Sequence, residues 1–145
     1  MLNSLADIPL PHTYADRQVK LKQWGFECSC SLCSLPEAER NISDTRRMLI
    51  AGIQENMLEA LDQHDLRRAA KFVEASMKII HDEDLTKTSA EVHESLARIY
   101  WALGDRNLAR HWARKCIDLR CDWDLLEPAN RTQKLMDLMS TFEVF

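Results

Sequence analysis

The stretch 90–119 reads AEVHESLARIYWALGDRNLARHWARKCIDL, and its pattern decides the fold class. Apolar and small residues recur every three or four positions on both sides of Gly104, which is the spacing of one helix face. Glycine commonly follows the last residue of a helix, because it adopts the left-handed conformation without steric cost. The stretch therefore predicts two helices that form a hairpin at Gly104.

A similar pattern lies 40 positions earlier in the chain. Small residues recur where the two helices of a hairpin approach closely. The pairs at this offset are His64-Asp65 with Gly104-Asp105, Ala69 with Ala109, Val73 with Ala113, and Ser76 with Cys116. The segment 90–119 resembles a tetratricopeptide repeat, whose usual period is ~34 residues. Because 40 is longer, we expect an extended link between the hairpins at about 81–87.

Hydrophobic periodicity outside this segment predicts further helices, so we expect an all-α fold of tetratricopeptide-like hairpins. The expected helices cover 14–24, 43–61 with an N-cap at Ser43-Asp44, 66–80, 88–103 with a cap at Thr88-Ser89, 107–119 and 128–141. In the first long helix the expected inward residues are Met48, Leu49, Ile53, Met57, Leu58 and Leu61. The last helix is expected to cap the stack with Leu135, Met136, Leu138, Met139 and Phe142.

The composition agrees with helices and excludes several classes of protein. Among 145 residues there are 3 glycines and 4 prolines, too few for a sheet rich in turns. The net charge of −4 gives no basic excess of the kind that drives non-specific binding to nucleic acid. No apolar run approaches the ~20 residues that cross a bilayer, and the first ten residues lack a secretory pattern. We expect a cytoplasmic or nuclear protein without a membrane partner.

Three of the five cysteines fall within six residues, at Cys28, Cys30 and Cys33. An odd number of cysteines is a poor disulfide framework, and this close spacing is typical of a metal site. Zinc is the expected ion, because it is borderline-soft and accepts thiolates. A closed structural site needs four ligands, and the cluster supplies three. The candidates for a fourth ligand within the chain are His12, Cys116 and Cys121.

The residues around the cluster resemble the post-SET segment of SET-domain protein-lysine methyltransferases, most closely the SET-and-MYND subfamily and its fungal relatives. The residues that carry the resemblance are Arg17, Leu21, Trp24, Gly25, Phe26, Cys28, Cys30 and Cys33. In that family a tetratricopeptide-like helical domain follows this segment. The resemblance therefore implies a post-SET-like segment at 1–40 and a helical domain at 41–145.

The resemblance also implies roles for single residues. The three cysteines would bind zinc, with a fourth ligand from an Asn-His-Ser-Cys motif in the catalytic core. Phe26 would contact the cofactor S-adenosylmethionine, because the aromatic residue before the first cysteine helps to wall that pocket in the family. This chain contains no Asn-His-Ser-Cys motif and no catalytic segment of the core. We therefore expect the C-terminal part of such an enzyme, inactive alone and without a catalytic residue of its own.

The alternative is a helical-repeat module that binds other proteins and has no enzymatic activity. If the repeat register holds, Glu94, Arg98 and Trp101 would line a groove for a protein or peptide partner. Arg106, Arg110 and Arg114 would form a basic stripe on the next helix, either solvated or in contact with an acidic partner. The five histidines lie in no arrangement typical of catalysis.

Overall fold

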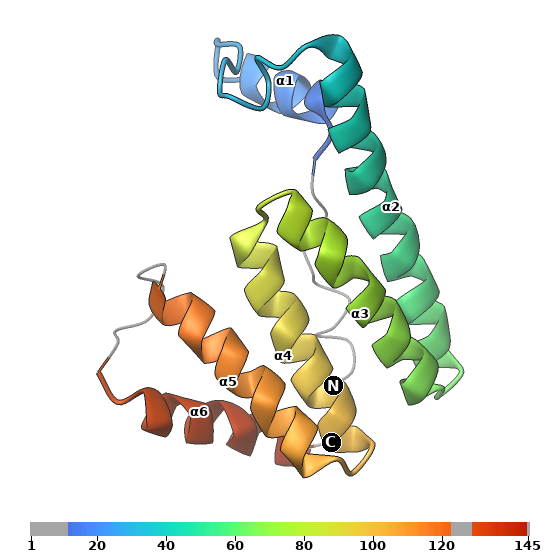
Figure 1. Cartoon of the computed structure of the whole chain (residues 1–145), viewed down its shortest axis with the longest axis vertical. Coiled ribbons are helices and arrows are strands. Elements are labelled where there is room, and N and C mark those ends of the chain that lie inside the picture. Colours follow the sequence, from blue (N-terminus) through green and yellow to red (C-terminus); the bar gives the residue numbers. More distant parts are fainter. Residues whose placement is uncertain (1–11, 123–128, 145) are drawn as a thin grey trace.

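The computed structural model describes residues 12–122 and 129–144, and every regular element in this part of the chain is helical. The predicted all-α class is thus confirmed. The elements are α1 (Tyr14–Lys22), α2 (Glu37–Asp62), α3 (Leu66–Asp82), α4 (Thr86–Ala102), α5 (Arg106–Asp122), α6 (Arg131–Ser140) and the 3₁₀ turn η2 (Thr141–Val144). Figure 1 shows α2, α3, α4 and α5 following one another as antiparallel neighbours, with α1 lying across the first end of α2.

Helices α3, α4 and α5 have equal lengths of 17 residues each. The links before them, 63–65, 83–85 and 103–105, are equally short. One helix with its link is 20 residues long, so the 40-residue offset in the sequence spans two helices and two links. The prediction of an extended link at 81–87 is wrong, because the additional length lies in the helices.

Each of the three links contains one residue with a positive φ angle. These residues are His64 (57°), Asp84 (52°) and Gly104 (86°). The amide of the next residue donates to a carbonyl five positions earlier, as from Asp105 to Tyr100 over 3.0 Å. Such bonds satisfy the last carbonyl groups of a helix and reverse the chain direction. The same geometry therefore ends α2, α3 and α4.

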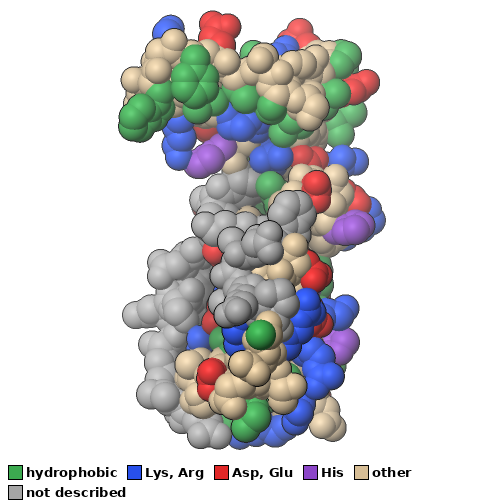
Figure 2. All heavy atoms as spheres, turned by 90° about the vertical axis from the view of Figure 1, so that its left-hand side faces the viewer, with side chains coloured by type: hydrophobic (Ala, Val, Ile, Leu, Met, Phe, Trp, Pro, Cys, Tyr) green, Lys and Arg blue, Asp and Glu red, His purple; other side chains and the backbone are tan. Residues whose placement is uncertain are grey.

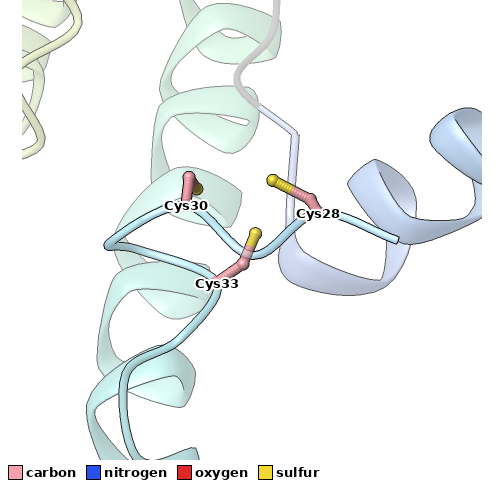
Figure 3. Close-up of side chains that lie close together, drawn as sticks. All are labelled: Cys28, Cys30 and Cys33. Carbon is pink, nitrogen blue, oxygen red and sulfur yellow. The ribbon is translucent and has the colours of Figure 1, made fainter. Parts of the chain in front are cut away.

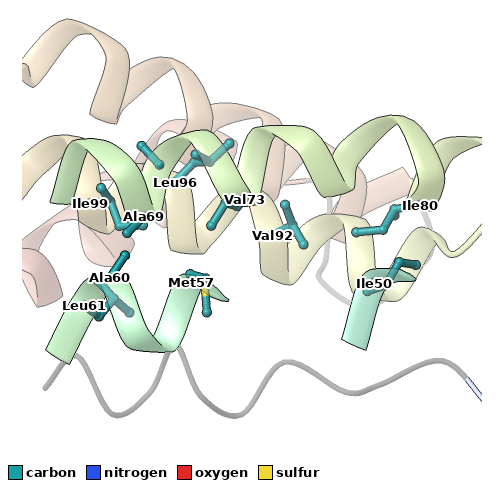
Figure 4. Close-up of a cluster of buried hydrophobic side chains, with 11 residues drawn as sticks. Ile50, Met57, Ala60, Leu61, Ala69, Val73, Ile80, Val92, Leu96 and Ile99 are labelled. Atoms are coloured by element: carbon teal, nitrogen blue, oxygen red, sulfur yellow. The ribbon is translucent and has the colours of Figure 1, made fainter. Parts of the chain in front are cut away.

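The helices bury two connected groups of apolar side chains, and Figure 4 shows the larger one between α2, α3 and α4. The small residues paired at the 40-residue offset are buried in α3 and α5, with Ala69, Ala109 and Ala113 fully buried. The smaller group joins α4 and α5 to the C-terminal segment. Its buried members are Ala97, Ala113, Ile117, Cys121, Leu135 and Phe142.

Helix α2 differs from its prediction in where it begins. It starts at Glu37, directly after Pro36, so Ser43 and Asp44 are interior residues and not its N-cap. Ser43 is buried, and the Asp44 carboxylate accepts a bond from the Tyr14 amide of α1 over 2.8 Å. The aspartate thus serves a neighbouring helix, which local sequence does not reveal. Helix α2 also runs unbroken across the boundary expected after residue 40.

Two residues expected to face the core from α2, Met48 and Leu49, are exposed (65% and 53%). In Figure 1 the first half of α2 extends beyond α3 and α4 and contacts α1 instead. The core of the bundle therefore has no surface against which these two side chains could pack. From Met57 to Leu61 the helix lies within the bundle, and the predicted inward positions are confirmed there.

Smaller corrections concern the ends of α4 and α6. Helix α4 begins at Thr86 after Leu85, which makes no side-chain cap, so the predicted cap at Thr88 is wrong. The left-handed turn at Asp84 starts the helix earlier than the capping pattern indicates. Helix α6 begins at Arg131; the predicted start at Pro128 lies outside the described residues. Met136 is exposed (58%), whereas the other expected capping residues of this segment pack on the bundle.

A buried ion pair joins the extended half of α2 to the link between α3 and α4. Arg47 Nε donates to Glu83 Oε2 over 3.2 Å, and both side chains are over nine-tenths buried. The Ser43 hydroxyl also donates to Glu83, and Arg47 Nη1 donates to the carbonyl of His12. One carboxylate therefore fixes the position of α2 relative to the α3–α4 link and, through Arg47, holds the chain before α1.

We predict that Gly104→Ala lowers the free energy of unfolding and that Gly52→Ala raises it, each by about 1 kcal/mol. Neither new Cβ would meet an atom within 4 Å, so only the backbone decides the sign. Gly104 has a positive φ, whereas Gly52 lies inside α2. Urea denaturation followed by circular dichroism measures both changes. The same sign for both variants would contradict this account.

We predict that Arg47→Met destabilises the protein by about 3 kcal/mol, because it leaves the Glu83 carboxylate buried without its main partner. Lys78→Met is the matched control: Lys78 pairs with Asp82 at the surface, where its side chain is 82% exposed. A pair of that kind contributes less than about 1 kcal/mol. Equal losses of unfolding free energy for the two variants in urea denaturation would show that the buried pair contributes no more than the exposed one.

Candidate metal centre

The cysteine segment follows a short helix that has defined signals at both ends. Thr13 caps α1 through a capping box with Asp16. After Lys22 the amides of Trp24 and Gly25 bond back to the last turn of the helix, and Gly25 adopts a positive φ of 81°. Glycine takes this conformation without steric cost. The chain therefore leaves α1 at a sharp angle before the first cysteine.

The three predicted ligands lie together. The sulfur atoms of Cys28, Cys30 and Cys33 are all within 4.8 Å of one another, and Figure 3 shows the three side chains gathered in one loop. Cys33 is buried, Cys28 is partly buried and Cys30 is exposed. The cluster could thus hold a metal ion, and one side of it is open to solvent.

Gln18 of α1 holds this loop against the helix, a role that sequence reasoning missed. Its amide donates to the carbonyl of Cys28 over 3.1 Å and accepts from the Cys28 amide over 3.0 Å. A glutamine on a polar helix gives no local signal of such a contact. The loop is also closed on itself, since the Ser34 amide donates to the carbonyl of Cys30. The loop thus has polar contacts that do not depend on a metal.

The surroundings of the cluster favour a negative charge on one of its sulfurs, that of Cys30. The backbone amide of Cys33, followed by the thiols of Cys28 and Cys33, lowers the pKa of Cys30 from 9.0 to about 7. The pKa of Cys28 is raised instead. The backbone amide of Cys30 lowers it, but hydrogen bonds to the thiols of Cys30 and Cys33, together with burial, have the larger opposite effect. Arg17 Nε donates to Cys33 Sγ over 3.4 Å. A guanidinium beside the cluster offsets part of its negative charge.

The spacing of the sulfurs suits a tetrahedral ion such as zinc. Zn–S bonds of ~2.3 Å in a tetrahedron place two sulfurs about 3.8 Å apart. The present sulfurs, within 4.8 Å, need to move by no more than about 1 Å to reach that distance. Three thiolates leave one of the four ligand positions of a tetrahedral ion free. The identity of the fourth ligand therefore decides what the site can do.

The structure brings none of the in-chain candidates for the fourth ligand into the described cluster. Cys116 and Cys121 are buried on α5, in the helical bundle. Burial raises the pKa of Cys116 to about 12, as expected for a core thiol. His12 lies with its Nε2 atom 2.8 Å from Lys20 Nζ. Within the described residues, the site therefore remains a set of three ligands.

Apolar side chains are exposed around the cysteine loop. Trp24 is 80% exposed, Phe26 56% and Val19 65%, and no residue of α1 is buried. Figure 2 shows hydrophobic side chains on the surface at this end of the molecule. Large aromatic side chains in solvent beside an open metal site are typical of a surface that another protein segment covers.

The three residues expected to line a peptide groove make contacts within the chain. Glu94 pairs with Arg98 at 3.1 Å and with Arg120 at 3.0 Å. Arg98 also donates to the Thr141 hydroxyl, and Trp101 packs edge-on against Phe142, which is fully buried. The C-terminal segment thus occupies part of this face, and peptide binding there stays a prediction.

No family model, curated protein or solved structure matches this chain. None of the described helices is long and apolar enough to cross a membrane.

We predict that, in the metal-free chain, Cys30 is the first thiol to react with iodoacetamide. The thiolate is the reactive form, so the rate should rise with pH through about 7 and level off above it. Cys116 should stay unmodified while the protein is folded, because it is buried and its pKa is about 12. Peptide mass spectrometry after short exposures gives the order. A midpoint near 9 for Cys30 would contradict the hydrogen bonding described here.

Proposed function

We propose that this chain is the C-terminal part of a SET-domain protein-lysine methyltransferase, in which Cys28, Cys30 and Cys33 bind zinc beside the catalytic core. The observation that carries the proposal is the gathering of the three sulfurs within 4.8 Å at one open site. A fourth ligand from another part of the enzyme would complete a structural zinc site. The zinc would then join the segment to the core.

The exposed aromatic residues support this arrangement. Phe26, two positions before Cys28, has 56% of its surface exposed, so it is free to line a pocket that a second segment closes. In the complete enzyme this residue would contact S-adenosylmethionine. Trp24, at 80% exposure, would lie in the same interface. This chain alone would then hold neither cofactor nor substrate and would have no methyltransferase activity.

The second candidate is a helical-repeat module that binds partner proteins and uses no catalytic core. The regular hairpins of α2 to α5 favour it, since stacked helical hairpins commonly present binding surfaces. The two candidates differ in what they require at the cysteines. The first needs a metal with a ligand from elsewhere, whereas the second functions without one.

Metal content is the first test. We expect the purified chain to hold well below one zinc per molecule, because three thiolates do not close a site. Cobalt(II) titration should show weak thiolate binding, which Cys30→Ser removes and Ser31→Ala keeps. Ser31 lies in the same loop and offers no thiol, so it controls for loop disturbance. One tightly held zinc per chain would mean that a ligand within the chain closes the site.

Binding of S-adenosylmethionine is the second test, because it separates the two parts of the proposal. We expect none by calorimetry in the isolated chain, since Phe26 is the single cofactor contact proposed for it. An in-frame Asn-His-Ser-Cys motif in the coding DNA upstream of Met1 would support the enzyme origin. Tight cofactor binding by the chain alone would contradict the proposed division of roles. An upstream frame without any such core would favour the interaction module.

A further inference from the structure

The three thiols of the cysteine loop differ in how well a molecule in solution can reach them. Cys30 is exposed, Cys28 is partly buried and Cys33 is buried, although their sulfur atoms all lie within 4.8 Å of one another. Cys116 and Cys121 are buried in α5, outside this cluster. An oxidant that meets the folded, metal-free chain therefore reaches the sulfur of Cys30 first.

Cys30 and Cys33 belong to one hydrogen-bonded turn, and Figure 3 shows the chain turning back between them. The Ser34 amide donates to the Cys30 carbonyl over 2.9 Å, which is the bonding pattern of one helical turn. Residues three apart in such a turn have Cα atoms about 5 Å apart. This distance lies inside the range of about 4.4–6.8 Å that a disulfide bridges. Rotation of the two side chains can therefore bring these sulfurs to bonding distance.

Cys28 is held in a different way. It precedes the turn, and both its amide and its carbonyl are bonded to the Gln18 side chain of α1. One residue separates it from Cys30, and the chain at 28–30 has no regular secondary structure. In an extended chain residues at this spacing lie about 7 Å apart, at the upper limit for a disulfide. Cys33 is therefore the better-placed partner of Cys30.

The burial of Cys33 suits it to react second. Arg17 Nε donates to its sulfur over 3.4 Å and holds it on the inner side of the loop. An oxidised cysteine, the sulfenic acid, is converted irreversibly to sulfinic acid unless a thiol reacts with it first. A buried thiol within 4.8 Å of an exposed one is shielded from the oxidant and close enough to trap its product.

We propose that the cysteine loop is a redox-sensitive modification site, in which hydrogen peroxide oxidises Cys30 and Cys33 then closes a reversible disulfide with it. In the first step the Cys30 sulfur attacks one peroxide oxygen. The S–O bond forms, the O–O bond breaks, and the leaving hydroxide takes the thiol proton as water. In the second step the Cys33 sulfur attacks the Cys30 sulfur. The S–S bond forms, the S–O bond breaks, and a second water leaves with the Cys33 proton. The two thiols thus lose two electrons in all, which the peroxide accepts.

The disulfide has a consequence for metal binding. It removes two of the three sulfur ligands, because a metal binds cysteine as the thiolate. Cys28 alone remains, so the oxidised loop has no metal site. Metal binding and oxidation therefore exclude each other. This consequence rests on the zinc site of the proposed function, whereas formation of the disulfide does not.

The test exposes the chelator-treated chain to one equivalent of hydrogen peroxide and then blocks the remaining thiols with N-ethylmaleimide. The tryptic peptide 23–40 carries all three thiols of the loop. Mass spectrometry of this peptide should show one disulfide and one blocked thiol. Further cleavage after Leu32 with chymotrypsin should give two fragments that the Cys30–Cys33 bond still joins. Dithiothreitol should restore three reactive thiols.

Two single variants separate the roles of the thiols, since each removes one of the three. Cys28→Ser should still form the disulfide. Cys33→Ser should lose it and accumulate a sulfenic acid that dimedone traps at Cys30. Circular dichroism should show the same helix content for both variants, because the buried core of the bundle lies between α2, α3 and α4.

A Cys28–Cys30 bond, disulfide-linked dimers or irreversible oxidation as the main product would overturn the proposal. Cobalt(II) binding before and after oxidation tests the consequence separately. Loss of the cobalt–thiolate absorption on oxidation, and its return with dithiothreitol, would support mutual exclusion, and unchanged absorption would overturn it. If the reduced chain binds no cobalt at all, the zinc site of the proposed function fails while the disulfide result stands.

Discussion

The arrangement of the helices depends on one backbone constraint, a left-handed residue immediately after α2, α3 and α4. At each of these positions the chain must reverse within three residues, and the two hydrogen bonds to the preceding helix can form only if φ is positive there. Gly104 meets this demand without steric cost, whereas His64 and Asp84 meet it with a side chain present. The three helices that follow these turns are also equal in length, so the small residues of α3 and α5 recur at one fixed offset.

A second constraint joins the two ends of the molecule. The helical bundle is held by apolar contact, but the half of α2 that extends beyond it has exposed apolar residues such as Met48. What fixes this half is polar: Glu83 receives bonds from Ser43 and Arg47, and Arg47 reaches the chain before α1. Breaking a buried pair of this kind leaves an uncompensated charge. The cysteine loop is therefore held in place by a few directional contacts and not by a hydrophobic core of its own.

Sequence reasoning succeeded where local pattern and tertiary structure agree. The periodicity of α3, α4 and α5 predicted their buried residues, and the cysteine spacing predicted that three sulfurs would meet. It failed where contacts with a distant segment of the chain determine the role of a residue. Asp44 looks like the N-cap of α2 in the sequence, but it lies inside α2 and accepts a bond from the first amide of the separate helix α1. The turn at Asp84 lacks glycine, so its likeness to the turn at Gly104 was hidden, and with it the 20-residue period. The contacts of Gln18 leave no trace in the sequence at all.

Helix α2 sets the distance between the cysteine loop and the turn into α3. Its 26 residues form one rod about 40 Å long, whose first end emerges from the cysteine loop and whose last end turns into α3. The cysteine loop lies near one end, and the link to α3 follows the other (Figure 1). A continuous helix of this length bends little, so the distance between its two ends is nearly constant. Whatever binds at the cysteine loop would therefore be kept at a set distance from the bundle end of α2.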